Sequence, residues 1–261
     1  MNFEKSSKLT VNGELNDEVI FRGDRSDTKY DTLPINWNGI KMDEATVLNM
    51  NYARVFGGTV GLQLKENNAT INNTIIHTFQ NAGIYGIKAN LTMNNVVMNN
   101  CGEADLAIAG GGIYNLNYCT IANYWNLNPS MSALGIYATD FYQNDDEIIS
   151  GNLNLIVKNS IIYGDVPDMI EFKKIANGSF ITDFKNSLLK FTSNSGLNPD
   201  NSNVKNEDPK FQNYFTQKMN LRVKTGSPAI GKGNPSYNDI TKKDIVGITR
   251  PSSNPTIGAY Q

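Results

Sequence analysis

Residues that could bind a ligand or act on one concentrate between positions 118 and 159. Two segments there, NYWNLNPSM (123–131) and DFYQNDDEIISGN (140–152), interrupt an otherwise regular spacing. Long loops on a rigid scaffold are frequent binding sites. Aromatic rings in and between these segments could stack on the apolar faces of sugars: Tyr124, Trp125, Tyr137, Phe141 and Tyr142. These residues predict a carbohydrate-binding site, and the open alternative is that the rings cover the core beneath their own loops.

The second segment also carries three consecutive acids, Asp145, Asp146 and Glu147. Clustered carboxylates are typical Ca²⁺ ligands, so we consider them a candidate metal site, with solvated loop acids as the alternative. Other chemistry is not favoured. The chain has a single histidine, His77, and no CxxC motif, which argues against a zinc site or a Ser-His-Asp triad.

The overall composition narrows the class of protein. Lys and Arg total 23 against 25 for Asp and Glu, so no basic surface for nucleic acid is expected. No apolar run is long enough to cross a membrane. Cys101 and Cys119 fall at different positions of the pattern described below, and whether they pair is open. Asparagine is the most frequent residue; it tolerates left-handed backbone and caps turns, which indicates an all-β chain with many tight corners.

A repeated six-residue pattern provides the elements that would position these residues. Its third residue, the anchor, is Asn or Tyr and recurs about every 22 residues at first: Tyr52, Asn73, Asn95, Tyr118, Asn159 and Asn186. The residue two before each anchor is apolar: Met50, Ile71, Met93, Leu116, Val157 and Phe184. We predict that these six side chains form one inward column along a solenoid.

A second strand follows most anchors: GLQL (61–64), IYGIKA (84–89), LAIA (106–109) and MIEF (169–172). Two short strands per repeat are too few for a propeller blade, and the pattern lacks the helix of ankyrin repeats and the LxxLxL of leucine-rich repeats. An antiparallel sandwich remains as the alternative. We predict a single-stranded right-handed parallel β-helix of about 22-residue coils over residues 1–207.

Residues 208–261 lack the pattern and are rich in Pro and Gly. We expect them to form a C-terminal cap that covers an open edge of the solenoid within one structural domain.

This C-terminal region also carries a resemblance. DPKF (208–211), LRV (221–223), GSPAIGKG (226–233), DIVGITRP (244–251) and TIGAY (256–260) are similar to the ending of exported bacterial β-helix repeat proteins of the pectate-lyase-like superfamily. The chain departs from that ending at Gly231, Thr256 and Gln261, where the superfamily usually has Asp, Asp and Glu. These departures weaken any role for acidic residues there.

The resemblance implies a secreted or outer-surface protein, with its export signal absent from this sequence, that associates with polysaccharide or a cell-surface glycan. We expect a monomer. The alternative function is a calcium-dependent lyase acting on uronate-containing polysaccharides, for which the superfamily usually supplies an Arg or Lys base; Arg54 and Lys88 are candidates. A polygalacturonase-like hydrolase is not favoured, because only its D-D pattern is present.

Overall fold

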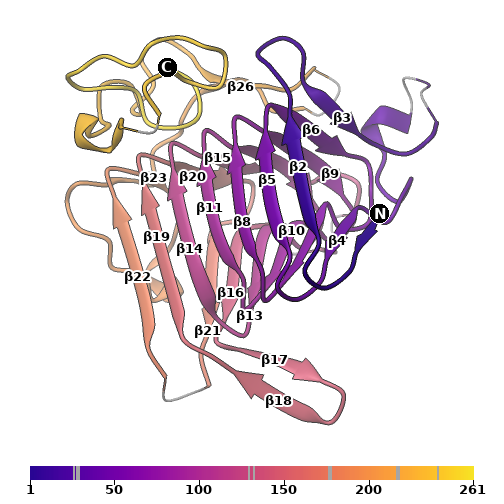
Figure 1. Ribbon diagram of the computed structural model, residues 1–261. Coiled ribbons are helices and arrows are strands. Elements are labelled where there is room, and N and C mark those ends of the chain that lie inside the picture. The colour runs from indigo at the N-terminus through magenta and orange to yellow at the C-terminus, as the bar shows by residue number, and fades with distance from the viewer. Residues whose placement is uncertain are drawn as a thin grey trace.

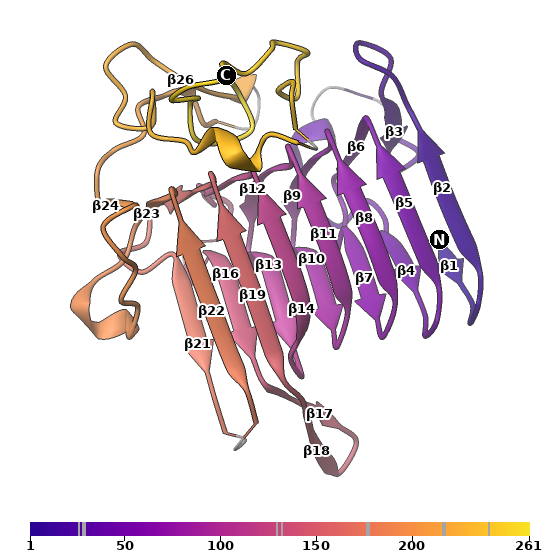
Figure 2. The same ribbon diagram turned by 60° about the vertical axis from the view of Figure 1, so that its left-hand side comes forward.

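The computed structural model describes residues 1–25, 27, 30–128, 130–131, 133–175, 178–215, 218–239 and 241–261. Its strands stack in three parallel sheets along one solenoid (Figures 1 and 2). The first sheet contains β1 (Asn2–Phe3), β4 (Ile40–Met42), β7 (Leu62–Lys65), β10 (Ala82–Ile87), β13 (Ala104–Ala109), β16 (Leu134–Thr139) and β21 (Ile170–Lys173). The second contains β2 (Lys8–Asn12), β5 (Val47–Asn51), β8 (Asn68–Asn72), β11 (Asn90–Asn94), β14 (Gly112–Asn117), β19 (Leu153–Lys158) and β22 (Phe180–Lys185). The third contains β3 (Val19–Phe21), β6 (Ala53–Phe56), β9 (Ile75–Phe79), β12 (Val97–Cys101), β15 (Thr120–Asn123), β20 (Ile161–Gly164), β23 (Leu188–Leu189) and β24 (Val204–Lys205).

The predicted right-handed parallel β-helix is confirmed, with one correction to its coil. Each complete coil has three strands, whereas the sequence pattern indicated two. The six-residue pattern is not one strand: its first half ends a strand of the second sheet and its second half begins a strand of the third. All six anchors have positive φ, from 46° at Tyr52 to 53° at Asn95. This left-handed conformation, which Asn tolerates better than most residues, turns the chain between the two sheets.

The predicted inward column is confirmed by strand register. Met50 pairs with Ile71, which pairs with Met93, and the series continues through Leu116, Val157 and Phe184. All six side chains are buried. The apolar side chain of each coil is buried against the equivalent side chains of the adjacent coils. The coils therefore stabilise one another.

Polar side chains at the same corner also stack along the solenoid. The Nδ2 of Asn95 donates to Oδ1 of Asn73 at 2.9 Å, and Asn73 donates to Oδ1 of Asn51 at 2.9 Å. The position after the anchor forms another row, in which the backbone N–H of Ser160 donates to Oγ of Ser187 at 3.1 Å. Cys119 occupies this row, and its thiol and that of Cys101 are both buried and free.

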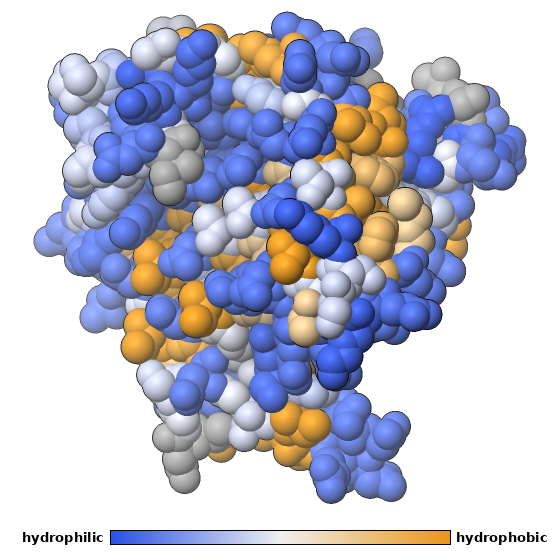
Figure 3. Space-filling view, viewed as in Figure 1, coloured by the Kyte–Doolittle hydropathy of each residue, from blue (hydrophilic) through white to orange (hydrophobic). Residues whose placement is uncertain are grey.

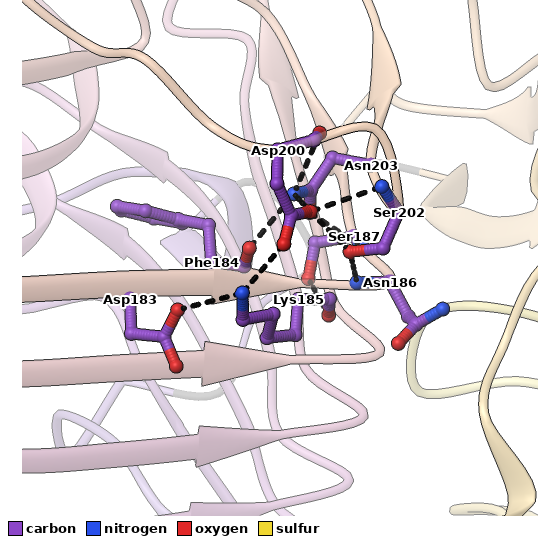
Figure 4. Close-up of polar contacts among 8 residues, drawn as sticks. All are labelled: Asp183, Phe184, Lys185, Asn186, Ser187, Asp200, Ser202 and Asn203. Atoms are coloured by element: carbon purple, nitrogen blue, oxygen red, sulfur yellow. Dashed lines mark hydrogen bonds and ion pairs between the residues drawn. The ribbon is translucent and has the colours of Figure 1, made fainter.

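Residues 190–203 lie over the last coil, and Figure 4 shows how their end is fastened. Asn203 extends the row after the anchors, because its Oδ1 accepts from the backbone N–H of Ser187 at 3.0 Å while its Nδ2 donates to the carbonyl of Phe184 at 2.7 Å. Lys185 lies between Asp183 and Asp200, with ion-pair distances of 3.5 and 2.5 Å. Phe191 and Leu197 pack against the end of the core.

The segment from residue 208 onward lies along the side of the solenoid, not over the end that we expected it to cover. It contains β25 (Phe211–Asn213), β26 (Asn220–Val223) and the 3₁₀ turn η4 (Pro235–Tyr237). Apolar residues of this segment pack on the outer face of the third sheet: Phe211, Leu221, Ala229, Ile245, Ile257 and Ala259. In Figures 1 and 2 the segment extends across the anchor corner of several coils.

Polar contacts join this segment to the anchors. Arg250 is buried, donates to Oδ1 of Asn95 at 2.8 Å and lies over the Tyr118 ring at 3.7 Å from its centroid. The Tyr118 hydroxyl donates to Asn238 at 2.5 Å. Gly258 approaches Thr120 so closely that a Cβ would lie 2.8 Å from its Oγ1, at a φ of 98° that glycine accommodates. Within the described residues, no helix is long and apolar enough to cross a membrane.

Candidate functional site

The five aromatic residues singled out from the sequence divide between two corners of the irregular coil. Tyr124 and Trp125 follow β15, at the corner leading to the first sheet. The Tyr124 ring stacks on Tyr214 with centroids 4.1 Å apart and meets Phe211 edge-on at 6.3 Å. Trp125 is 7% exposed and donates from Nε1 to the Asn128 carbonyl at 3.0 Å. These two rings are packed against the protein.

The other insertion forms an antiparallel hairpin, β17 (Phe141–Asn144) and β18 (Glu147–Ser150), at the corner between the first and second sheets. It projects on the side of the solenoid away from the C-terminal segment (Figures 1 and 2). Tyr142 lies against Gly110, where a Cβ would approach its Cδ1 to 2.6 Å. The acids 145–147 are exposed at the hairpin turn. Among the described residues, no group of three or more His, Cys, Asp or Glu side chains is arranged to hold a metal ion.

Tyr137 lies on the outer face of the first sheet in a row set by strand register. Tyr85 pairs with Ala107, and Ala107 pairs with Tyr137. Both tyrosines are half-buried, while Ala107 between them is buried. Because neighbouring strands are about 4.8 Å apart, the two tyrosines stand roughly 10 Å apart on either side of a small residue.

A hollow of about 240 Å³ lies beside Tyr137. Its lining defines what we call the first-sheet face: Glu103, Ala104, Ala107, Leu134, Tyr137, Glu171 and Lys173, together with Tyr85 at its edge. The floor is apolar and the rim is charged. This combination suits a ligand that has both C–H faces and hydroxyl groups.

Two of the charged residues on this face, Glu171 and Lys173, form an ion pair beside the Tyr137 ring. The Lys173 ammonium lies 3.3 Å from the Glu171 carboxylate and 5.3 Å from the centroid of the Tyr137 ring. Hydrogen bonding to Glu171 raises the pKa of Lys173, which therefore stays protonated at neutral pH. Burial raises the pKa of Tyr85, and the nearby Glu103 carboxylate and Tyr142 hydroxyl add to this effect. Tyr142 lies against Gly110, just after the end of β13 in the first sheet.

Sequence reasoning selected Tyr137 and Tyr142 but missed Tyr85, which lies in a regular coil. A usable signal was the Ile-Tyr pair itself, which occurs at 84–85 and again at 136–137, and strand register places the two pairs in equivalent positions. Superposing those two strands would have placed both tyrosines in one outward row.

His77 and the buried Asp105 do not line this face. The His77 ring stacks on Phe56 with centroids 5.0 Å apart, and burial, reinforced by the charge of Arg54, lowers its pKa to about 3. Burial likewise raises the pKa of Asp105 well above its usual range, and this carboxyl lies beside the Cys101 thiol. Neither group is available to exchange protons with a bound ligand.

The fold places this chain among the right-handed parallel β-helix proteins. No protein-family model and no curated protein matches its sequence. Among solved structures, a crystal structure of pectate lyase Pel9A aligns over 100% of this chain and 87% of its own, with 11% identity and a TM-score of 0.31. A likeness this distant carries no argument about function, which must come from the first-sheet face itself.

Proposed function

We propose that this protein is an exported or cell-surface β-helix protein that binds polysaccharide on the first-sheet face. The observation that supports the proposal is the outward row in which Tyr85 and Tyr137 flank Ala107 beside a hollow of about 240 Å³. Each ring presents an apolar surface on which the C–H face of a sugar can stack, and the charged rim can exchange hydrogen bonds with sugar hydroxyls.

The rigidity of the sheet favours such binding. Tyr85 and Tyr137 stand on strands paired on both sides, so ordering them for a ligand costs little conformational entropy. Glu103 and Glu171 supply acceptors, and Lys173 supplies a donor that is already held over the Tyr137 ring. Tyr142 and Phe141 on the hairpin would contact a chain that extends beyond the hollow.

The alternative is a calcium-dependent lyase acting on uronate-containing glycans. Lys88 lies against Gly110 and Gly151 at the base of the hairpin and pairs with Glu66 at 3.5 Å, whereas the three acids lie at the turn at the other end of β17 and β18. This alternative would require Asp145, Asp146 and Glu147 to come together around the ion, and Lys88 to leave Glu66 and lose its own proton before it could take one from the sugar.

Binding to a glycan array, followed by calorimetry with the best ligand, tests the proposal. Tyr137→Ala should weaken binding about tenfold or more, since aromatic anchors dominate such contacts, while leaving the melting temperature nearly unchanged. Tyr163→Ala is a matched control, because Tyr163 is also half-buried on an outer sheet face with a lysine ammonium 5.0 Å from its ring. Equal affinity of Tyr137→Ala and the wild type would refute the proposal.

The same purified protein separates the two functions. A lyase releases unsaturated uronate products that absorb ultraviolet light, and this release would disappear with a chelator. Turnover that survives in Lys88→Ala would exclude the proposed base.

A further inference from the structure

The outer face of the second sheet carries two parallel rows of uncharged polar side chains. Strand register aligns Asn51, Asn72, Asn94 and Asn117 in one row. The adjacent row, two residues earlier on each strand, is Asn49, Thr70, Thr92 and Asn115. Neither row has a charged residue from β5 to β14. Figure 3 shows this side of the molecule, where hydrophilic residues cover most of the surface below the C-terminal segment.

The C-terminal segment overhangs these rows and creates a groove. One hollow of about 590 Å³ is lined by Asn51, Asn72 and Asn94 on the sheet and by Asp239 and residues 241–244 opposite. A second of about 260 Å³ continues past Asn94 and Asp239 to Asn115, Asn117 and Tyr237. Because Asn94 and Asp239 line both hollows, together they form one channel across the strands, which we call the ladder groove.

Hydrogen-bonding capacity remains on the floor of the ladder groove. Asn94 donates to Oδ1 of Asn72 at 2.9 Å, which uses only part of the capacity of each amide. Asn117 donates to the Tyr237 carbonyl at 2.9 Å, but its own Oδ1 is buried and accepts no hydrogen bond from any described residue. A ligand in the groove cannot reach that oxygen, so the hydrogen-bonding capacity open to a ligand lies on the partly exposed amides of Asn72 and Asn115.

The wall of the groove adds an aromatic ring and charges of both signs. Tyr237 is half-buried, and the Lys158 ammonium lies 4.6 Å from its ring centroid. Lys242, Lys243 and Asp239 line the same wall. Lys158, in register with Asn117 on β19, adds one charge at the end of a floor that is otherwise uncharged from β5 to β14. Such a floor, facing a wall of mixed sign, does not select a ligand of strong net charge.

We propose that the ladder groove binds a neutral, extended polysaccharide chain that runs along the solenoid axis. The floor offers an amide or hydroxyl group on every strand, about 4.8 Å apart in a straight line. A straight chain of hydroxyl-bearing sugars matches that repeat over several strands, whereas a coiled chain leaves the floor after a short contact. This site lies on a different sheet from the first-sheet face and does not depend on it.

Calorimetry on the full-length protein with two neutral oligosaccharides tests the proposal: cellohexaose, which is extended, and maltohexaose, which coils. Cellohexaose should bind and maltohexaose should bind more weakly. Asn115→Ala should weaken the affinity for cellohexaose about fivefold, which is the effect of one lost hydrogen bond. Asn115→Trp should block the groove and abolish binding there. Asn49→Ala is the matched control: it lies in the same row outside both hollows, and neither Asn49 nor Asn115 has a side-chain hydrogen bond to a described residue.

The outcomes distinguish this groove from the first-sheet face. An affinity lost in Tyr137→Ala and kept in Asn115→Trp would overturn the ladder groove while supporting the first-sheet face. The ladder-groove proposal would also be overturned if cellohexaose did not bind, or if Asn115→Ala and Asn49→Ala had equal effects. Neither result bears on binding at the first-sheet face.

Discussion

The neutral state of His77 gives the protein a measurable acid sensitivity. His77 is buried in β9 with its ring stacked on Phe56, and its Nδ1 lies 2.9 Å from Oγ1 of Thr78. Removal of the ring from water lowers its pKa from 6.5 to about 3. Below pH 6.5 the unfolded chain therefore binds a proton that the native state does not bind. As a result, the free energy of unfolding falls as the pH falls.

The size of this loss follows from the two pKa values. Each pH unit between about 6.5 and 3 removes about 1.4 kcal/mol. From pH 7 to pH 4.5, His77 alone should therefore lower the free energy of unfolding by about 2.5 kcal/mol. Carboxylates also titrate toward the lower end of this range, so their contribution has to be separated from that of His77.

His77→Phe provides the separation, because a phenyl ring can keep the stack on Phe56 and does not titrate. The free energy of unfolding of both proteins is measured with urea at pH 7 and at pH 4.5. The decrease between these two pH values should be about 2.5 kcal/mol larger in the wild type than in the variant. The chain has one histidine, so its imidazole signal in proton NMR is unambiguous and should not titrate between pH 8 and 5. An imidazole that titrates near pH 6.5, or parallel pH dependence in the two proteins, would refute this reasoning.

Other perturbations test the core, the C-terminal segment and the hairpin. The raised pKa keeps the buried Asp105 neutral while the same residue ionises in the unfolded chain, so the free energy of unfolding should fall as the pH rises from 4 to 8. Asp105→Asn should make this fall smaller. Urea midpoints that change equally with pH in both proteins would contradict this. Trp125→Ala should lower the free energy of unfolding by about 3–5 kcal/mol without changing glycan affinity, and a lost affinity would return this ring to the binding site. Deletion of 208–261 should produce protein that aggregates in light scattering, since it uncovers the apolar third sheet; a soluble monomer would argue against that role. If the hairpin acids hold Ca²⁺, calorimetry should detect calcium binding that is abolished when residues 145–147 are changed to their amides, and a wild type without binding would remove the lyase alternative.

The coil architecture could be predicted because its determinants are local. An anchor such as Asn73 adopts a left-handed turn, and the apolar residue two positions earlier points inward, so both recur at the coil period. The count of strands per coil was missed for a related reason. The turn at Tyr52 uses one residue and the turn at Asn159 uses two, so two strands in different sheets resemble one uninterrupted pattern in the sequence.

The candidate site was only partly predictable because burial of an aromatic residue depends on distant segments. Trp125 and Tyr142 look alike in sequence, as aromatic residues in insertions of the same coil. Tyr124 next to Trp125 is covered by Tyr214, which comes from the C-terminal segment. Tyr142 instead lies at the edge of the first sheet over Gly110. The spacing of residues within 118–159 therefore does not predict which of these rings is buried and which lies at the edge of the sheet.

The chemistry of the outward residues explains which faces of the solenoid are free to bind. The third sheet turns Val97, Ile161 and Leu188 outward, and an exposed patch of this kind requires a cover, which the C-terminal segment supplies. The second sheet turns out rows of Asn and Thr that remain stable in water, so the same segment needs only to touch their upper edge and leaves the ladder groove beneath it. The first sheet turns out tyrosines and paired charges beside small residues, and the described C-terminal residues do not line the hollow there. One sheet is therefore covered by the C-terminal segment, and the two proposed binding faces lie on the other two sheets.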